Sequence, residues 1–394
     1  MNSFDFYSPT YFAFGREKET DCGTYIRRFG GHRVLVVYGS RIAKDTALLE
    51  KIHSSVTRAG LTYLDFTGVE TNPGSEKVYE GIELCRRESI DFLLAVGGGS
   101  TIDTCKAIAI GVPYAGDFWD FFTGKTPEDA LGVGVVLTLA SSGSEGSPNA
   151  IITNEKTLDK CACEGDVVRP RFAVMDPQLT TTLPPYQTAA GVTDIISHCF
   201  ERYFTATENV EITDRMIEGT VIGLMYEARR VMADPADCDA RANIMWAGML
   251  SHNDSMGVGR QQDWTCHHLE HTMSALFGCT HGAGMAVIMP AWMIYCIENS
   301  EDVTRFVQMA VRIFGCDMDY RDPKRTARQG VERFKAFLHE IGMPLTFREI
   351  GADPMQIPQL VEMNHAGEQK AGQFCGGVDC HDIRKIYEIA AEIL

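Results

Sequence analysis

Residues 91–107 read DFLLAVGGGSTIDTCKA, and this stretch decides the fold of the first half of the chain. Its start is a short apolar run of the kind that builds a buried strand, and its end has the pattern of a helix. Between them, Gly97, Gly98, Gly99 and Ser100 leave the backbone open to a phosphate, because glycine has no Cβ atom. The N–H groups and the positive dipole end of the helix also favour an anion. The stretch therefore predicts a pyrophosphate-binding turn, although a tight turn without a ligand would use the same residues.

The same alternation of short and long segments continues on both sides of this turn. From about Arg33 onward, short β-branched runs alternate with amphipathic stretches, which is typical of strand–helix–strand units on a parallel sheet. Aromatic and polar residues alternate over residues 1–15, which predicts a half-buried strand pair. Further strands are expected at VLVVYGS (34–40), LTYLDFTGV (61–69), GVGVVLTLA (132–140) and RPRFAVMDP (169–177), and helices near 42–58 and 76–87.

The second half of the chain follows a different pattern. The segment TTTLPPYQ (180–187) carries the proline and polar residues of a domain junction. Beyond it, apolar residues recur at helical spacing over 186–204, 240–254, 263–278 and 284–300. A chain of 394 residues also exceeds the roughly 250 to 300 residues at which a single core stops growing. We therefore predict an α/β domain over residues 1–181 and an all-helical bundle domain over residues 182–394.

Composition excludes several classes of protein. The 53 acidic and 36 basic residues give a net charge of -17, and no dense run of Lys or Arg is present to follow a nucleic acid backbone. The N-terminus lacks the basic start and apolar block of a signal peptide, and no apolar run approaches the roughly 18 residues that span a bilayer. The 13 cysteines contain no CxxC pair, which favours reduced thiols. We expect a cytoplasmic protein that binds neither nucleic acid nor membrane.

The end of the first long strand bears on the choice of dinucleotide. A site selective for NAD would usually place an Asp or Glu there to hold the ribose hydroxyls, whereas this strand ends in Gly39 and Ser40. Without that carboxylate a 2′-phosphate meets no repulsion, and Ser40, Arg41 or Lys44 is available to contact it. NADP(H) is therefore favoured over NAD(H), unless an acidic partner lies elsewhere in the sequence.

The helical half contains a group of metal-binding side chains. Asp194 and His198 are four residues apart in one expected helix, and His267 and His271 repeat the spacing in another, so each pair shares a helix face. His281 follows a short turn just before the next apolar helix. A carboxylate with imidazoles and no thiolate suits Fe(II) or Zn(II). Seven other histidines lack such spacing and are interpreted as structural or surface groups: His32, His53, His252, His268, His339, His365 and His381.

Five motifs carry a family resemblance over essentially the whole chain. They are GGGSTIDTCK (97–106), LTLASSGSE (137–145), AVMDP (173–177), GVTDIISH (191–198) and QDWTCHHLEH (262–271) with the following His281. On these motifs the chain resembles the iron-containing, or group III, alcohol dehydrogenase family, and more closely its NADPH-dependent butanol dehydrogenase and aldehyde reductase branch. It differs from that branch after the first strand, where YGSRIAKD replaces the usual YGGGS.

The resemblance implies a Rossmann-like, dehydroquinate-synthase-like N-terminal domain and a homodimeric enzyme that interconverts small alcohols and aldehydes with NADP(H). It implies that Asp194, His198, His267 and His281 hold Fe(II), with Zn(II) as the alternative, and that His271 stands beside the nicotinamide and passes a proton. Contacts to the cofactor are expected from Gly39, Ser40, Lys44, Gly97, Gly98, Gly99, Ser100, Asp103, Thr138, Ser144 and Lys160, the last of these facing a phosphate of the nicotinamide half.

Two other functions use similar parts. A lyase of the dehydroquinate synthase type shares the scaffold, but it must hold a phosphorylated, carboxylated substrate, and the segments around the metal residues offer mainly Arg260 as a cation. A protein that binds NADP without catalysis is the third candidate, and it gives no reason for His271 in addition to four ligands.

Overall fold

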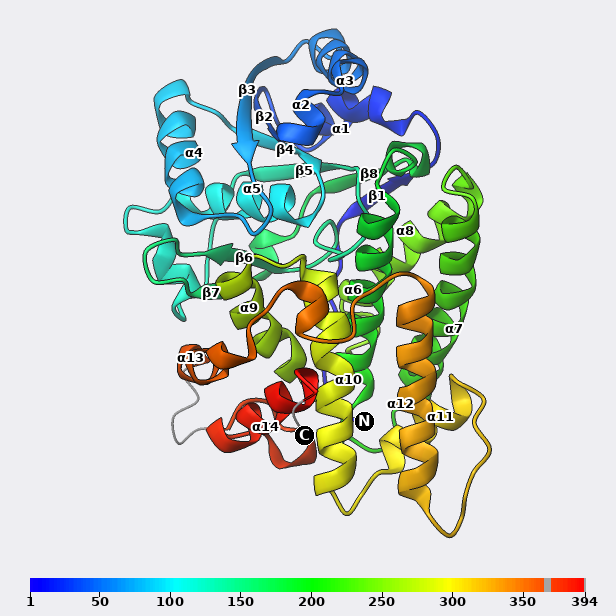
Figure 1. Ribbon diagram of the computed structural model, residues 1–394. Helices are drawn as coiled ribbons and strands as arrows, with labels where there is room; N and C mark the ends of the chain where they lie inside the picture. The colour runs from blue at the N-terminus through cyan, green and yellow to red at the C-terminus, as the bar shows by residue number, and fades with distance from the viewer. Residues whose placement is uncertain (365–369, 393–394) are drawn as a thin grey trace. The chain divides into compact units, whose positions relative to one another are not determined.

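The computed structural model describes residues 1–364 and 370–392, and Figure 1 traces them from blue to red. The chain divides into two compact units. The sheet unit contains Tyr7–Leu183 and Ala236–Asn253, and the helical unit contains Met1–Phe6, Pro184–Pro235 and Asp254–Leu394. The step from Leu183 to Pro184 thus lies beside the junction expected near Thr181, while residues 236–253 group with the sheet. The domain bounds 1–181 and 182–394 stay a prediction.

A six-stranded sheet forms the centre of the sheet unit. Its strands lie in the order β1-β8-β5-β4-β2-β3, and every neighbouring pair is parallel. The bounds are β1 (Tyr11–Phe14), β2 (Arg33–Gly39), β3 (Thr62–Val69), β4 (Phe92–Gly97), β5 (Gly132–Leu137) and β8 (Phe172–Met175). All six residues of β4 are buried, as expected for a strand with parallel neighbours on both sides. The predicted parallel α/β fold is confirmed.

The two faces of the sheet are covered by different helices because side chains alternate along each strand. On β2, Val34 and Val36 belong to an apolar cluster with α1 (Cys22–Arg28) and α3 (Thr46–Arg58). The intervening residues of β2, Leu35 and Val37, join a second cluster with α4 (Ser75–Glu88) and α5 (Gly99–Gly111). The sheet unit also includes α2 (Ser40–Ala43) and α8 (Cys238–His252).

Three local predictions need correction. Residues 1–10 form no strand, so the expected N-terminal strand pair reduces to β1, which pairs with β8. The helix expected at 42–58 is divided into α2 and α3, because the side chain of Asp45 accepts a hydrogen bond from the Leu48 N–H and caps α3. An antiparallel hairpin of β6 (Asn149–Thr153) and β7 (Lys160–Glu164) was not predicted, since strands of five residues are too short for a clear periodicity.

Helices make up the helical unit, as predicted for the second half of the chain. They are α6 (Pro185–Tyr203), α7 (Glu211–Ala233), α9 (Thr265–Phe277), α10 (His281–Asn299), α11 (Thr304–Arg312), α12 (Pro323–Glu340), α13 (Ile357–Met363) and α14 (Cys380–Ala390). α10 packs against α6, α9, α12 and α14, which explains why it is apolar on almost every side. Among the described helices, none has both the length and the apolar character needed to cross a bilayer.

Candidate functional site

The glycine turn joins β4 to α5 and is packed closely by the segment that follows β5. A Cβ atom on Gly99 would lie 2.5 Å from Ser142 Oγ, and one on Gly98 would lie 3.2 Å from Leu139 Cβ. Within the described chain, α5 has no side-chain hydrogen bond at its N-cap, Gly98. The start of the helix therefore keeps N–H groups for an anion, as the pyrophosphate-binding turn requires.

The region expected to hold the 2′-phosphate lies at the end of β2. The Arg41 guanidinium donates hydrogen bonds to Thr138 Oγ1 at 2.8 Å and to the Thr138 carbonyl at 3.4 Å, so it lies beside the segment that follows β5. Ser40 and Lys44 are exposed on α2 and directly after it. Gly39 has a separate packing reason to be glycine, because a Cβ atom there would lie 2.6 Å from the Val69 carbonyl oxygen. Packing therefore requires glycine at this position, whichever dinucleotide binds.

Of three other residues expected at the cofactor, Asp103 and Ser144 are buried in the sheet unit and Lys160 is not. The carboxylate of Asp103 is buried and accepts hydrogen bonds from Ser144 Oγ at 2.5 Å and from the Ile151 N–H at 3.1 Å. Lys160 begins β7, and its ammonium group donates to Asn72 Oδ1 at 3.2 Å. Asp103 and Ser144 thus bond to each other and to neighbouring protein groups, whereas Lys160 is half-buried at the start of β7.

The expected metal ligands come together in the helical unit. α6 carries Asp194 and His198 one turn apart, α9 carries His267, and His281 is the first residue of α10. Asp194 Oδ1 lies 3.8 Å from Nε2 of both His198 and His267, and 3.3 Å from His281 Nε2. Potential ligand atoms of Asp194, His267 and His281 all lie within 4.8 Å of one another. Three imidazoles therefore converge on one carboxylate oxygen.

His271 lies at the border of this cluster. Its ring centroid is 5.6 Å from that of His281 and 6.4 Å from that of His267. It is half-buried, and potential ligand atoms of His271, Glu270 and His281 also lie within 4.8 Å of one another. None of the other six described histidines joins a group of three potential ligands. His365 lies outside the described residues.

Two buried glutamates that sequence reasoning missed orient the imidazoles. Glu201 Oε1 lies 2.9 Å from His267 Nδ1 and also accepts the His267 backbone N–H at 2.9 Å. Glu270 Oε2 contacts His281 Nδ1 in the same way. Each contact at Nδ1 turns the Nε2 atom toward Asp194, and carboxylates hold metal-binding imidazoles in this way. A signal was available, because Glu201 follows Asp194 by seven residues and so shares its helix face.

The electrostatics of the cluster suit a cation. Burial would raise the pKa of Asp194, but the imidazoles of His198 and His281 hold it well below the ordinary value. Burial also lowers the pKa of His198 well below its ordinary value, although the charge of Asp194 opposes that decrease. Among the described residues, buried His267 Nε2 has no hydrogen-bond partner and lies 3.8 Å from Asp194 Oδ1, which costs about 1–3 kcal/mol unless a ligand uses the lone pair. One carboxylate and three imidazoles fit Fe(II) or Zn(II).

Buried arginines near this cluster are already occupied. Arg260 donates to the carbonyls of Arg202 at 2.9 Å and Val210 at 3.1 Å, and it pairs with Asp214 at 2.8 Å. Arg202 donates to the His198 carbonyl at 3.0 Å and lies 4.7 Å from the ring centroid of Trp264. The cation that a doubly anionic lyase substrate would need is therefore engaged in holding the helices together.

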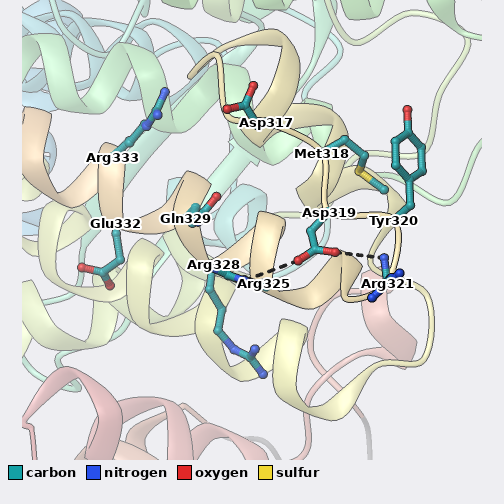
Figure 2. A pocket seen from close by; sticks show the side chains of 10 residues that line it. All are labelled: Asp317, Met318, Asp319, Tyr320, Arg321, Arg325, Arg328, Gln329, Glu332 and Arg333. Carbon is teal, nitrogen blue, oxygen red and sulfur yellow. Dashed lines mark hydrogen bonds and ion pairs between the residues drawn. The ribbon is translucent and has the colours of Figure 1, made fainter.

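An open hollow of about 970 Å³ lies elsewhere in the helical unit, along α12 and the segment before it (Figure 2). Its lining is rich in arginine and contains neither His nor Cys. Arg328 is paired with Glu298 at 2.6 Å, and Arg325 with Asp319 at 3.6 Å. This surface therefore offers no group for acid–base or metal chemistry comparable to the histidine cluster.

Comparisons with known proteins agree with this arrangement. The family model of iron-containing alcohol dehydrogenases matches residues 9–177, and the model of the C-terminal part of the Fe-containing alcohol dehydrogenase family matches residues 188–390. The chain is 37% identical over 373 residues to the probable NADH-dependent butanol dehydrogenase 2 of Bacillus subtilis (strain 168), an alignment that covers 93% of this chain and 95% of that protein. It is 33% identical over 400 residues to the NADPH-dependent aldehyde reductase YqhD of Escherichia coli (strain K12), covering 99% and 100% of the two chains.

A solved structure extends the likeness to the fold. The crystal structure of NADH-dependent butanol dehydrogenase A from Thermotoga maritima matches with a TM-score of 0.94 and 34% identity, over 99% of each chain. Sequence and fold therefore agree over almost the full length. The chain belongs to the iron-containing alcohol dehydrogenase family of oxidoreductases, which implies iron and a nicotinamide cofactor.

Proposed function

We propose that this oxidoreductase interconverts small aldehydes and alcohols with NADP(H) and an iron ion held by Asp194, His198, His267 and His281. The observation that carries the ligand assignment is the convergence of three imidazole Nε2 atoms on Asp194 Oδ1. The butanol dehydrogenases and the aldehyde reductase among its relatives support the substrate class. Zinc fits the same donors, and availability in the cell often decides between the two ions.

Different residues would orient the metal ligands and transfer the proton. When bound, the ion supplies Lewis acidity toward an oxygen and the reduced nicotinamide supplies a hydride. Glu201 and Glu270 hold the imidazoles in the orientation that binding requires. We assign proton transfer to His271, because it borders His267 and His281 without belonging to the four ligands.

The choice of NADP(H) over NAD(H) depends on the end of β2. The names of the relatives include both NADH-dependent and NADPH-dependent enzymes, so relatedness alone leaves the choice open. No acidic residue lies between Tyr38 and Lys44, and the guanidinium of Arg41 is held at this place by Thr138. A cation held beside the adenosine ribose would favour a 2′-phosphate.

A homodimer and a cytoplasmic location belong to the same proposal. β1 is an edge strand of the six-stranded sheet, and its Tyr11 and Phe14 side chains are exposed. Unpaired edges and exposed aromatic rings are places where a second copy attaches. Light scattering after size exclusion would measure the mass in solution, and a single-chain mass at micromolar concentration would contradict the dimer.

The enzymatic proposal is tested by following NADPH absorbance with butanal. We expect consumption that stops after treatment with a chelator and returns when Fe(II) or Zn(II) is added. His281→Ala should lose bound metal and aldehyde reduction together. Full metal occupancy by elemental analysis in this variant, or consumption that a chelator leaves unchanged, would refute the assignment.

A further inference from the structure

Lys106 is a fully buried cation for which the chemistry proposed above has no use. It lies on α5, three residues after Asp103, and none of its side chain reaches solvent. Burial lowers the pKa of Lys106 to about 8, and the negative charge of Asp103 opposes that decrease. A buried ammonium group is costly unless its donors are all used.

The donors of Lys106 are directed at one segment, the turn between β5 and β6. Its Nζ atom donates to the Asn149 carbonyl at 2.7 Å, to Ser144 Oγ at 2.9 Å and to the Ser147 carbonyl at 3.0 Å. Ser144 in turn donates to Asp103 Oδ1 at 2.5 Å. Two side chains of α5 therefore hold residues 144–149 from beneath by a connected set of hydrogen bonds.

The same segment is held from its other side and packs on the glycine turn. Gly143 has a φ of 64°, and a Cβ atom there would lie 2.6 Å from the Gly248 carbonyl oxygen of α8. Ser142 and Leu139 lie against the glycine turn. A Cβ atom placed on Gly99 would be 2.5 Å from Ser142 Oγ, and one placed on Gly98 would be 3.2 Å from Leu139 Cβ. The width of the space above the glycine turn therefore depends on where this segment is fixed.

We propose that Asp103 and Lys106 are positioning residues, which fix residues 138–149 against the glycine turn and thereby set the affinity for the dinucleotide without touching it. This inference rests on the proposed function, because it takes the glycine turn to hold the cofactor phosphates. It also changes the expected role of Asp103 and Ser144 from contacts with the cofactor to supports beneath its site. Removing the ammonium group would take its donor from the Ser147 carbonyl and leave the Asn149 carbonyl with the longer bond from Ser147 Oγ at 3.4 Å, so the segment would move outward to reach water.

The test is dinucleotide binding measured by calorimetry or by NADPH fluorescence, with no substrate present. Lys106→Met keeps the length of the side chain, and we expect the Kd for NADPH to rise about tenfold or more, with kcat at saturating NADPH close to that of the parent. Ile108→Ala is the control on the same helix, because Ile108 packs toward Gly81 on α4. A general loosening of α5 would raise the Kd in both variants, and that result would overturn the proposal.

A second variant covers the case in which Lys106→Met does not fold. Ser144→Ala removes the hydroxyl between Asp103 and Lys106 and leaves the backbone acceptors, so we expect a smaller rise in Kd, about threefold to tenfold. A parental Kd in Ser144→Ala and in any folded Lys106→Met would overturn the positioning role. If the parent itself binds neither NADPH nor NADH, the proposed function fails instead, and the two failures are thus distinguishable.

Discussion

Replacement of Glu201 by Gln tests whether the imidazoles converge on Asp194 in order to hold a metal. Glu201 is 1% exposed, and its Oε1 atom faces both the Nδ1 atom and the backbone N–H of His267 at 2.9 Å. Gln has nearly the same shape and keeps one acceptor, but it has no charge and brings an N–H₂ group. The ring of His267 then loses the charged partner that raises its basicity, and the N–H₂ group competes for the position that fixes its tautomer.

The expected loss follows from this single contact. Changes to the outer partner of a histidine ligand reduce metal affinity by about 10-fold to 100-fold, which corresponds to about 1.4 to 2.7 kcal/mol. The fold should survive, because the substitution leaves the volume of a buried side chain unchanged. We therefore expect Glu201→Gln to purify as a folded protein with a weaker metal site and reduced aldehyde reduction that excess metal restores.

The assay is a titration of metal-free protein with Zn(II) against a chromophoric chelator of known affinity. Glu218→Gln is the matched control. Glu218 lies on α7, is also buried at 3% exposure, and accepts a hydrogen bond from Tyr203 Oη at 2.8 Å. In the described part of the chain its carboxylate contacts Tyr203, Arg215 and Arg312 and none of the histidines, so the metal affinity of this variant should equal that of the parent. Parental affinity in Glu201→Gln, or an equal loss in both variants, would refute the role given to Glu201.

Three further outcomes are expected. Ser40→Asp places a carboxylate where the 2′-phosphate is expected, without the backbone clash that a Cβ atom on Gly39 would cause. We expect the ratio of kcat/KM to shift from NADPH toward NADH by about tenfold or more. An unchanged ratio would contradict the argument drawn from the end of β2. His271→Ala should keep the parental metal content by elemental analysis while kcat falls by about 10²-fold, and a parental kcat and pH profile would place proton transfer elsewhere. Burial raises the pKa of the Cys22 thiol to about 12. Above about pH 9 the unfolded chain therefore loses a proton that the folded chain keeps. The free energy of unfolding then falls by about 1.4 kcal/mol per pH unit. Cys22→Ala should therefore flatten the decrease in urea midpoint between about pH 9 and 10.5, whereas Cys380→Ala, at an exposed thiol, should follow the parent; equal slopes in all three proteins would contradict this.

The fold was largely predictable because its elements carry strong local patterns. β4 is an unbroken apolar run that ends in three glycines, and such a run has few alternatives to a buried strand. The hairpin of β6 and β7 escaped prediction, because pairing partners rather than periodicity define strands of five residues. Asp45 divided an expected helix, which a residue with N-cap chemistry in the middle of an amphipathic stretch could have indicated.

The candidate metal ligands were accessible to sequence reasoning for a similar reason. Asp194 and His198 are separated by four residues, so their joint position on one helix face follows from helix geometry alone. Gly39 is a contrary case, since sequence reasoning connected this glycine with the cofactor, and the structure adds the nearby Val69 carbonyl oxygen as a second cause. When both packing and cofactor binding favour glycine at a position, the sequence alone cannot separate the two causes.

The helix face that Glu201 shares with Asp194 was visible in the sequence, but the contacts that orient the chemistry were not, because they join residues that are distant in sequence. Glu201 and His267 are 66 residues apart, and Lys106 and Ser144 are 38 residues apart. The Glu201 carboxylate behind an imidazole and the Lys106 ammonium group beneath a turn are both costly to bury. Each contributes to ligand binding only through the group that it holds in place. We therefore expect the replacement of Glu201 to weaken metal binding, and the replacement of Lys106 to weaken dinucleotide binding, more than either replacement lowers the free energy of unfolding. If Glu201→Gln and Lys106→Met instead changed the melting temperature while leaving metal and dinucleotide affinity intact, both would be ordinary parts of the core.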